Sequence, residues 1–303
     1  MDKNYSAYLK KKSVTIFLFH GVINKNPFKI RNYTKKHLLK NDFIKVLNNL
    51  NSKGTCITLD EVYETSQKNL NFKDYSYVIT FDDGFYNNFK IAAPILKKKK
   101  LSATFYITTS FIDKNEMSWI DKIELMVEKT KSNKIINIFN KNFKILNNRK
   151  SKISFLDSVR YFAKKESTDF NQLVLRIKDQ LKFTGKLSNL NNLIDKKMSW
   201  SNVKELNKNK NFTIGAHSVN HAILSFLKDL EAKREIIESI NTIKKKAKIN
   251  VKHFSYPEGL KHTYGKREIN LLKEKGIILS PSAEFGVNSK KTDLFNLKRI
   301  LVS

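Results

Sequence analysis

Residues 77–84 read Tyr-Val-Ile-Thr-Phe-Asp-Asp-Gly, and no other segment of the chain carries as much information. The apolar run Tyr77–Phe81 predicts a buried strand that delivers two adjacent carboxylates, Asp82 and Asp83, to its C-terminal end. Gly84 then permits a sharp turn. In an α/β protein, ligands and chemistry are found at the C-terminal ends of the strands. The segment therefore predicts a functional site or, since Asp and Gly are ordinary turn residues, a plain turn.

Two adjacent carboxylates repel each other unless something offsets their charge. A metal ion bound to one of them would do so and would leave the other free to act as a base. Residues 212–221, Phe-Thr-Ile-Gly-Ala-His-Ser-Val-Asn-His, form a second predicted strand with a polar end. One helical turn beyond this strand would place His217 and His221 on the same side. Two histidines and one carboxylate suffice for a catalytic zinc site with an open position for water.

The combination of these two segments resembles the polysaccharide deacetylases of the NodB-homology type, carbohydrate esterase family 4. Further segments are similar to motifs of that family: Ser-Ala-Thr-Phe-Tyr-Ile at 102–107, Ser-Trp-Ser at 199–201, Phe-Ser-Tyr-Pro-Glu-Gly at 254–259 and Leu-Lys-Arg-Ile at 297–300. Phe-His-Gly at 19–21 is similar to the N-terminal Tyr-His motif of one branch. The resemblance covers residues 14–107 and 200–303.

Strand-like and helix-like segments alternate along the chain, which predicts an α/β fold with a parallel sheet and crossover helices. The resemblance implies a distorted or incomplete (β/α) barrel of about seven strands, formed by a single domain over residues 1–303. Residues 113–198 interrupt the alternation with mostly helical, Lys- and Asn-rich sequence. They predict a helical insertion, either a substrate lid over the strand ends or a solvated decoration.

The resemblance also implies roles for single residues. Asp83, His217 and His221 are expected to hold a divalent metal, for which Zn²⁺ is the first candidate and other divalent ions suit the same ligands. Asp82 is expected to be the general base that takes a proton from the attacking water.

A general acid must then protonate the leaving amine, and most family members carry this acid in a C-terminal Leu-x-Leu-His motif. This chain ends Leu-Lys-Arg-Ile-Leu-Val-Ser without a histidine. His20 matches the N-terminal histidine that serves as the acid in the branch with the Tyr-His motif, and we expect it to take that role. The family's third motif usually supplies an arginine that orients the base. Here Arg299 is the candidate for that task, or else one surface cation among many.

Residues 254–259, which are similar to the family's third motif, and two tryptophans are candidates for substrate contacts. Backbone N–H groups near Tyr256, Pro257, Glu258 and Gly259 could stabilise an oxyanion. Glu258 stands where the family usually has an aromatic residue. Trp119 and Trp200 could stack on a sugar ring, although a single Trp more often belongs to the core.

The net charge of +30 arises from 58 Lys and Arg against 28 Asp and Glu. Compositional drift and an anionic partner both remain open as explanations. Because no RNP-type aromatic pattern, zinc finger or P-loop appears, we expect no specific nucleic-acid partner. The single cysteine, Cys56, and the lack of an apolar run of about 20 residues favour a cytoplasmic protein, with peripheral contact to an anionic membrane as an option.

These features predict a metal-dependent hydrolase that removes N-acetyl groups from an acetamido sugar of a cell-surface glycan or its precursor. The substrate could be free, nucleotide-linked or linked to a carrier lipid. Two alternatives remain open: a non-catalytic glycan-binding relative, and a basic adaptor that binds nucleic acid or membrane.

Overall fold

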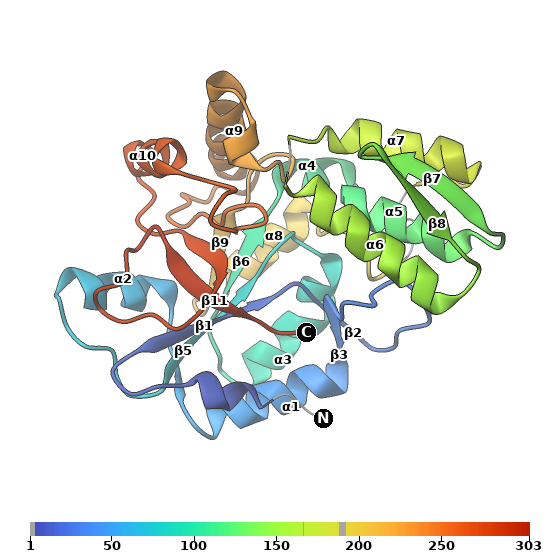
Figure 1. Cartoon of the computed structure of the whole chain (residues 1–303). Helices are drawn as coiled ribbons and strands as arrows, with labels where there is room; N and C mark the ends of the chain where they lie inside the picture. Colours follow the sequence, from blue (N-terminus) through green and yellow to red (C-terminus); the bar gives the residue numbers. More distant parts are fainter. Residues whose placement is uncertain (1–3, 166, 188–191) are drawn as a thin grey trace.

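A seven-stranded parallel sheet forms the centre of the molecule (Figure 1). Its strands are β1 (Val14–Phe19), β4 (Thr55–Cys56), β5 (Ser76–Phe81), β6 (Ala103–Ile107), β9 (Phe212–Ala216), β10 (Pro281–Phe285) and β11 (Leu297–Leu301). Along the sheet the order is β10-β11-β1-β5-β6-β9, and β4 pairs with β5 beside this path. The computed structural model describes residues 4–165, 167–187 and 192–303.

Isolated bridges close this sheet into a distorted barrel. Ala216 at the end of β9 pairs with Phe254, and His253 pairs in turn with Leu279, just before β10. The N–H of Ala216 donates to the carbonyl of His253 at 3.0 Å. The predicted distorted (β/α) barrel of about seven strands is confirmed, and its closure is made by single bridges instead of a continuous ladder.

The strand register brings polar residues to one edge of the barrel. The last residue of β1, Phe19, pairs with the last residue of β5, Phe81, and β9 ends beside β6 in the same way. Parallel strands therefore release the residues that follow them at a common edge. These residues are His20, Asp82 and His217.

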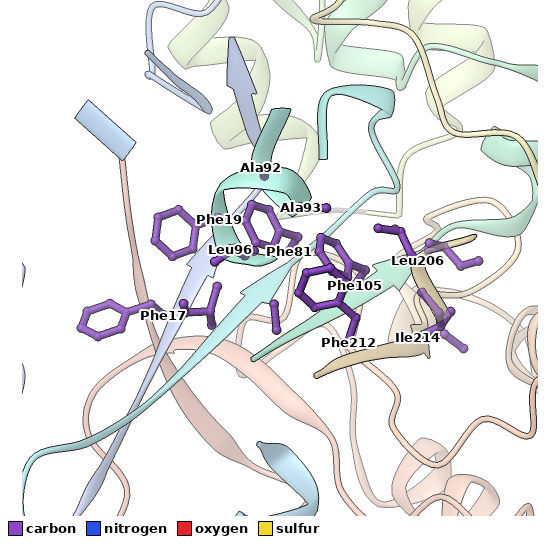
Figure 2. Packing of buried hydrophobic residues seen from close by; sticks show 14 of the residues in the cluster. Phe17, Phe19, Phe81, Ala92, Ala93, Leu96, Phe105, Leu206, Phe212 and Ile214 are labelled. Atoms are coloured by element: carbon purple, nitrogen blue, oxygen red, sulfur yellow. The ribbon is translucent and has the colours of Figure 1, made fainter. Parts of the chain in front are cut away.

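Aromatic side chains fill the space between the outer face of the sheet and the helices that cover it (Figure 2). Phe81 stacks on Phe19 at a centroid distance of 5.4 Å and on Phe105 at 5.1 Å. Phe105 meets Phe212 edge-on at 5.4 Å. Because side chains alternate along a strand, Phe81 on the outer face leaves Asp82 to point into the barrel.

Helices run outside the strands: α1 (Lys40–Asn51), α2 (Leu59–Gln67), α3 (Ala93–Lys98), α4 (Thr109–Lys114), α8 (Trp200–Asn207), α9 (Asp229–Ala247) and α10 (Lys266–Glu274). The apolar side of α1 shows why such segments fold as helices, since Phe43, Leu47 and Leu50 recur at helical spacing and are buried. Within residues 4–165, 167–187 and 192–303, no helix combines the length and apolar character needed to cross a membrane.

The insertion at residues 113–198 forms a lobe beside the barrel (Figure 1). It contains α5 (Trp119–Lys129), α6 (Arg149–Ala163) and α7 (Phe170–Leu181), together with an antiparallel hairpin of β7 (Lys134–Ile138) and β8 (Lys141–Ile145). It has a core of its own that includes Ile123, Ile136, Phe155 and Ile177. The insertion is therefore a packed unit with a hairpin among its helices.

The sequence prediction of a helical insertion missed this hairpin. Phe139 and Asn140 form its two-residue turn with φ of 52° and 53°, the left-handed conformation that a tight hairpin requires. Asn is a common residue there, but Phe is not, so the turn lacked its usual signal. The buried Ile136 and Ile138 alternate with exposed residues among many Lys and Asn.

A short strand and the start of β10 complete the surroundings of the barrel. His37 lies in the short strand β3 (His37–Leu39) and is buried. β3 pairs with β2 (Gly21–Ile23). Leu279 makes a single bridge, and the ladder strand β10 begins at Pro281. Proline is usually confined to the start or the edge of a strand, and β10 uses it at its first residue.

We expect Phe105→Ala to destabilise the protein by about 3–5 kcal/mol, because the ring is fully buried and its removal leaves a cavity between two other aromatic rings. Urea unfolding followed by circular dichroism measures this change. Phe285→Ala is the matched control, since that ring is 68% exposed. A change of similar size in both variants would contradict the assignment of Phe105 to the central core.

Candidate active site

A cavity of about 330 Å³ opens at the C-terminal edge of the barrel. The barrel contributes all the residues predicted for catalysis and metal binding, namely His20, Asp82, Asp83, His217, His221 and Arg299. The insertion contributes Ser118, Trp119, Ile120, Arg160 and Lys164 to the opposite wall. The insertion therefore helps to enclose the site.

Asp82 is held by a buried arginine. Arg299 donates from Nη1 to Oδ1 of Asp82 at 3.0 Å and from Nη2 to Oδ2 at 2.9 Å. The hydroxyl of Ser255 also donates to Oδ2 at 3.3 Å. Burial alone would raise the pKa of Asp82, but Arg299 and then His217 lower it, and the resulting pKa lies below its ordinary value. Asp82 is therefore a fixed, ionised carboxylate at neutral pH.

The side chain of Asp83 points in a different direction from that of Asp82, because the backbone of Asp83 has φ of 75°, a left-handed conformation. Its Oδ2 lies 3.3 Å from the ammonium of Lys36. Its Oδ1 is buried and has no hydrogen-bond partner among the described residues. Burial would raise the pKa of Asp83, but Lys36 and His221 lower it well below its usual range. One oxygen is thus paired with a cation, and the other is left facing the two histidines.

Both imidazoles present Nε2 to this free oxygen. His217 Nε2 lies 3.6 Å from Oδ1 of Asp83, and His221 Nε2 lies 3.4 Å from it. Nδ1 of His217 lies 2.7 Å from the carbonyl of Ser255, which can only accept, so that nitrogen carries the proton and Nε2 has a free lone pair. The ring of His221 packs nearly parallel to Phe111 at 6.3 Å.

These three side chains fit a divalent metal. Their ligand atoms all lie within 4.8 Å of one another. An unpartnered buried carboxylate oxygen beside an imidazole nitrogen with a free lone pair is what a bound cation would satisfy. A backbone carbonyl that fixes the second nitrogen of a ligating histidine is also usual in metal sites. The predicted ligand set of Asp83, His217 and His221 is thus brought together.

His20 lies in the same cavity and outside this ligand set. Its Nδ1 is buried without a hydrogen-bond partner among the described residues. Burial lowers the pKa of His20 to about 4, and the opposing effect of the Asp83 carboxylate does not restore it. The imidazole is therefore neutral at neutral pH, so a role as an acid requires that it gain a proton during turnover.

The third motif supplies less of an oxyanion site than the sequence suggested. The N–H of Tyr256 donates to the carbonyl of Pro281, and the N–H of Gly259 donates to that of Pro257 at 2.7 Å. Pro257 has no N–H. Of the four residues, only Glu258 has an N–H without an acceptor in the part of the chain that the structure describes. The predicted donors are therefore already occupied, Tyr256 by the first residue of β10 and Gly259 within its own turn.

Glu258 and Trp200 also differ from their expected surroundings. The carboxylate of Glu258 lines the cavity and forms an ion pair with Lys164 of the insertion. Burial would raise the pKa of Glu258, but Lys164 lowers it to about 2. Trp200 is absent from the lining of the cavity, and its indole N–H donates to Asp113 at 2.7 Å. Its predicted role in sugar stacking at the metal site therefore lacks support.

Two lysines near the metal ligands were missed by sequence reasoning. Lys36 bridges Asp83 and Asp121, with its ammonium 3.4 Å from Oδ2 of Asp121. Lys197 is buried with its ammonium 3.4 Å from the ring centroid of Phe85, and burial lowers its pKa to about 8. Neither lysine belongs to a recognisable motif, so nothing in the sequence distinguishes them from the other lysines.

Comparison with models of known protein families supports the resemblance inferred from the motifs. A model of the polysaccharide deacetylase family matches residues 69–155 and 158–278. The chain belongs to the polysaccharide deacetylase family. The match includes the two aspartates, both histidines and the third motif, whereas His20 and Arg299 lie outside it. A search of curated proteins returns no significant match.

Solved structures of deacetylases share this fold. The deacetylase PplD from Streptococcus pyogenes, in complex with acetate, superposes with a TM-score of 0.61 at 15% identity, covering 96% of this chain and 92% of that one. IcaB from Ammonifex degensii has a TM-score of 0.61 at 14% identity, with coverage of 98% and 94%. A de-N-acetylase from Aggregatibacter actinomycetemcomitans has a TM-score of 0.59 at 14% identity, with coverage of 96% and 95%.

We expect Arg299→Met to destabilise the fold by about 3–5 kcal/mol, because the Asp82 carboxylate would remain buried without its counter-charge. In the double variant Arg299→Met, Asp82→Asn, most of this loss should be recovered, since the unpaired charge is gone. Urea unfolding of the wild type, both single variants and the double variant measures the coupling. Strictly additive losses would contradict a direct pairing of the two residues.

Proposed function

We propose that this protein is a metal-dependent N-deacetylase that acts on an acetamido sugar of a glycan. The observation that carries this proposal is the convergence of Asp83, His217 and His221 beside the paired Asp82 in one cavity. Family membership supports the deacetylase reaction. The metal requirement and the sugar are inferences from the residues at the site.

Asp83, His217 and His221 would hold the metal, with Zn²⁺ as the first choice for one carboxylate and two imidazoles. When bound, such an ion would polarise the acetamide carbonyl and lower the pKa of water. Lys36 pairs with Oδ2 of Asp83 and so leaves Oδ1 for the ion. Asp83 would therefore hold the ion through Oδ1, while Oδ2 stays paired with Lys36.

Asp82 is proposed as the general base. Its carboxylate is ionised, and the guanidinium of Arg299 fixes its orientation through two hydrogen bonds. It accepts a proton from the water that attacks the acetamide carbon. The C–N bond then breaks, the acetyl group leaves as acetate, and the sugar nitrogen must receive a proton to depart as an amine.

His20 is proposed to deliver that proton. Its resting imidazole is neutral because its pKa is about 4. The proton that Asp82 takes from the attacking water is the proposed source of the proton that His20 donates, since both side chains line the same cavity. His20 then donates the proton to the leaving nitrogen and returns to its neutral form.

A non-catalytic glycan-binding role is the first alternative, and the presence of all three ligand residues together with the base counts against it. A basic adaptor that binds nucleic acid or membrane is the second alternative.

We also propose a cytoplasmic location with peripheral contact to an anionic membrane. A groove at the N-terminal ends of β6 and β9 supports such contact, since it is lined by one glutamate and by Lys90, Lys97, Lys100, Lys208 and Lys210.

Acetate release tests the proposed function directly. The purified protein, reconstituted in turn with Zn²⁺ and other divalent ions, should release acetate from a free, a nucleotide-linked or a lipid-linked N-acetylated sugar. Elemental analysis should find one metal per chain. Stoichiometric metal without turnover on any substrate form would favour the glycan-binding alternative, and the absence of bound metal would remove the proposal.

Asp82→Asn should retain the metal and lose activity by about 10²- to 10⁴-fold, because the base is removed while the ligand Asp83 stays in place. Metal content by elemental analysis and initial rates of acetate release separate the two effects. His221→Ala is the contrasting variant and should lose the metal itself. Near wild-type kcat in Asp82→Asn would mean that another group takes the proton.

His20→Ala should slow hydrolysis of an acetamide much more than hydrolysis of an acetyl ester, since an alkoxide leaves with less need for protonation than an amine. Initial rates of the wild type and of the variant on both substrates measure the effect. Equal losses on amide and ester would count against proton delivery by His20.

A further inference from the structure

The loop after β9 carries both histidines of the proposed metal site, and its backbone is unusual. His217 and His221 are separated by only three residues. Ser218 and His221 have φ of 60° and 58°, in the left-handed region that residues other than glycine seldom adopt. Such a conformation persists only where the surrounding contacts determine it. The direction of the His221 side chain therefore depends on the groups that hold this loop.

The two imidazoles are fixed in different ways. The ring of His217 is oriented by a hydrogen bond, since its Nδ1 lies 2.7 Å from the carbonyl oxygen of Ser255. The ring of His221 instead packs nearly parallel to Phe111 at a centroid distance of 6.3 Å, a contact that lacks the directionality of a hydrogen bond. The position of His221 is therefore set mainly by its backbone.

Glu235, in the second turn of α9, binds the centre of this loop, and its side chain is buried. Its Oε2 accepts hydrogen bonds from the N–H groups of Val219 at 3.0 Å and of Asn220 at 2.8 Å. Its Oε1 accepts from the side-chain amide of Asn220 at 2.7 Å. Hydrogen bonds to an ionised carboxylate are about twice as strong as those between neutral groups, so Glu235 is a firm anchor between the two histidines.

The opposite side of the loop is held by the first residues of α4. The N–H of Thr109 donates to the carbonyl of Ser218 at 3.2 Å, and the N–H of Ser110 donates to the carbonyl of Val219 at 2.9 Å. Within the loop, the N–H of His221 donates to the hydroxyl of Ser218 at 2.9 Å. The start of α4 thus binds carbonyl groups of the loop, while the carboxylate from α9 binds its N–H groups. Together they fix the peptide planes from both sides.

We infer that Glu235 is a positioning residue of the proposed metal site: it holds the left-handed loop that turns His221 toward Asp83. This inference rests on the proposed function. Glu235 is absent from the lining of the metal-side cavity and lines a second cavity of about 730 Å³, which shares Trp119 with the first. It therefore acts through the backbone of the loop, without touching the ion.

Glu238 on the same helix provides a matched control. It forms an ion pair with Arg234 at 3.1 Å, one helical turn away, and its side chain is 50% exposed. Glu235, by contrast, is 7% exposed and bonds to the loop. The two glutamates share their residue type and their helix, so a difference between their variants reports the contact with the loop.

The affinity for Zn²⁺ tests this inference. Glu235→Ala removes all three acceptor contacts and should raise the Kd for Zn²⁺ by about 10- to 100-fold, the usual loss when a partner of a ligating residue is removed. Glu235→Gln should keep most of the affinity, because its amide oxygen can accept from the two backbone N–H groups while the Asn220 amide turns to accept from Nε2. Glu238→Ala should keep the wild-type Kd. Competition with a chromophoric chelator, starting from metal-free protein, measures these values.

A shorter side chain separates position from charge. Glu235→Asp keeps the negative charge but withdraws the carboxylate from the loop by one methylene, so its affinity should fall as in Glu235→Ala. Wild-type affinity in Glu235→Ala, or equal losses in Glu235→Ala and Glu235→Gln, would overturn the inference. If Glu235→Ala fails to fold, Glu235→Asp decides the matter, since wild-type affinity in that variant also overturns it.

Amide hydrogen exchange of the metal-free protein separates this inference from the proposed function. In Glu235→Ala, the N–H groups of Val219, Asn220 and His221 should exchange faster than in the wild type, whereas those of β5 should keep their rates. A wild type that binds no metal would remove the proposed function, and faster exchange in the loop would still support Glu235 as its anchor. Unchanged exchange at His221 would overturn the inference, whatever metal the protein binds.

Discussion

Two neighbouring carboxylates must stay ionised inside the protein, and the rest of the site depends on how this is achieved. Asp82 and Asp83 are both buried, where like charges repel strongly and unpaired charges are costly. The left-handed backbone at Asp83 separates the two side chains, and each then meets a different cation. Arg299 comes from the last strand of the barrel, and Lys36 comes from the loop before β3. The different surroundings of Asp82 and Asp83 follow from this division.

Ion pairs join the insertion to the site. Asp121 of α5 pairs with Lys36, which itself pairs with Asp83, and Lys164 pairs with Glu258 of the third motif. Ile30, from the loop before β3, also packs into the apolar core of the insertion. These contacts hold the lobe beside the barrel, where it forms a wall of the cavity. The same position creates the second cavity beside the first.

Local patterns predicted much of the barrel and the convergence of Asp83, His217 and His221, because apolar strands followed by polar residues deliver those residues to one edge of a parallel sheet. Arg299 could be predicted only through the family resemblance, and its contact with Asp82 depends on β11 lying beside β1. No sequence pattern predicted the contact between Lys36 and Asp83. Lys36 is brought to Asp83 by the preceding loop, in which Asn32 and Lys35 have a left-handed backbone. The hydrogen bonds that occupy the third motif likewise depend on the fold, since Tyr256 donates to Pro281 of β10 and Gly259 donates to Pro257.

The position of β11 has a consequence for how the protein is made. β11 lies between β10 and β1, and its Arg299 is separated from Asp82 by 217 positions in the sequence. During synthesis, the carboxylates, the histidines and most of the barrel leave the ribosome before this strand does. A nascent chain therefore holds Asp82 without its guanidinium, and the carboxylate becomes oriented only when β11 inserts next to β1.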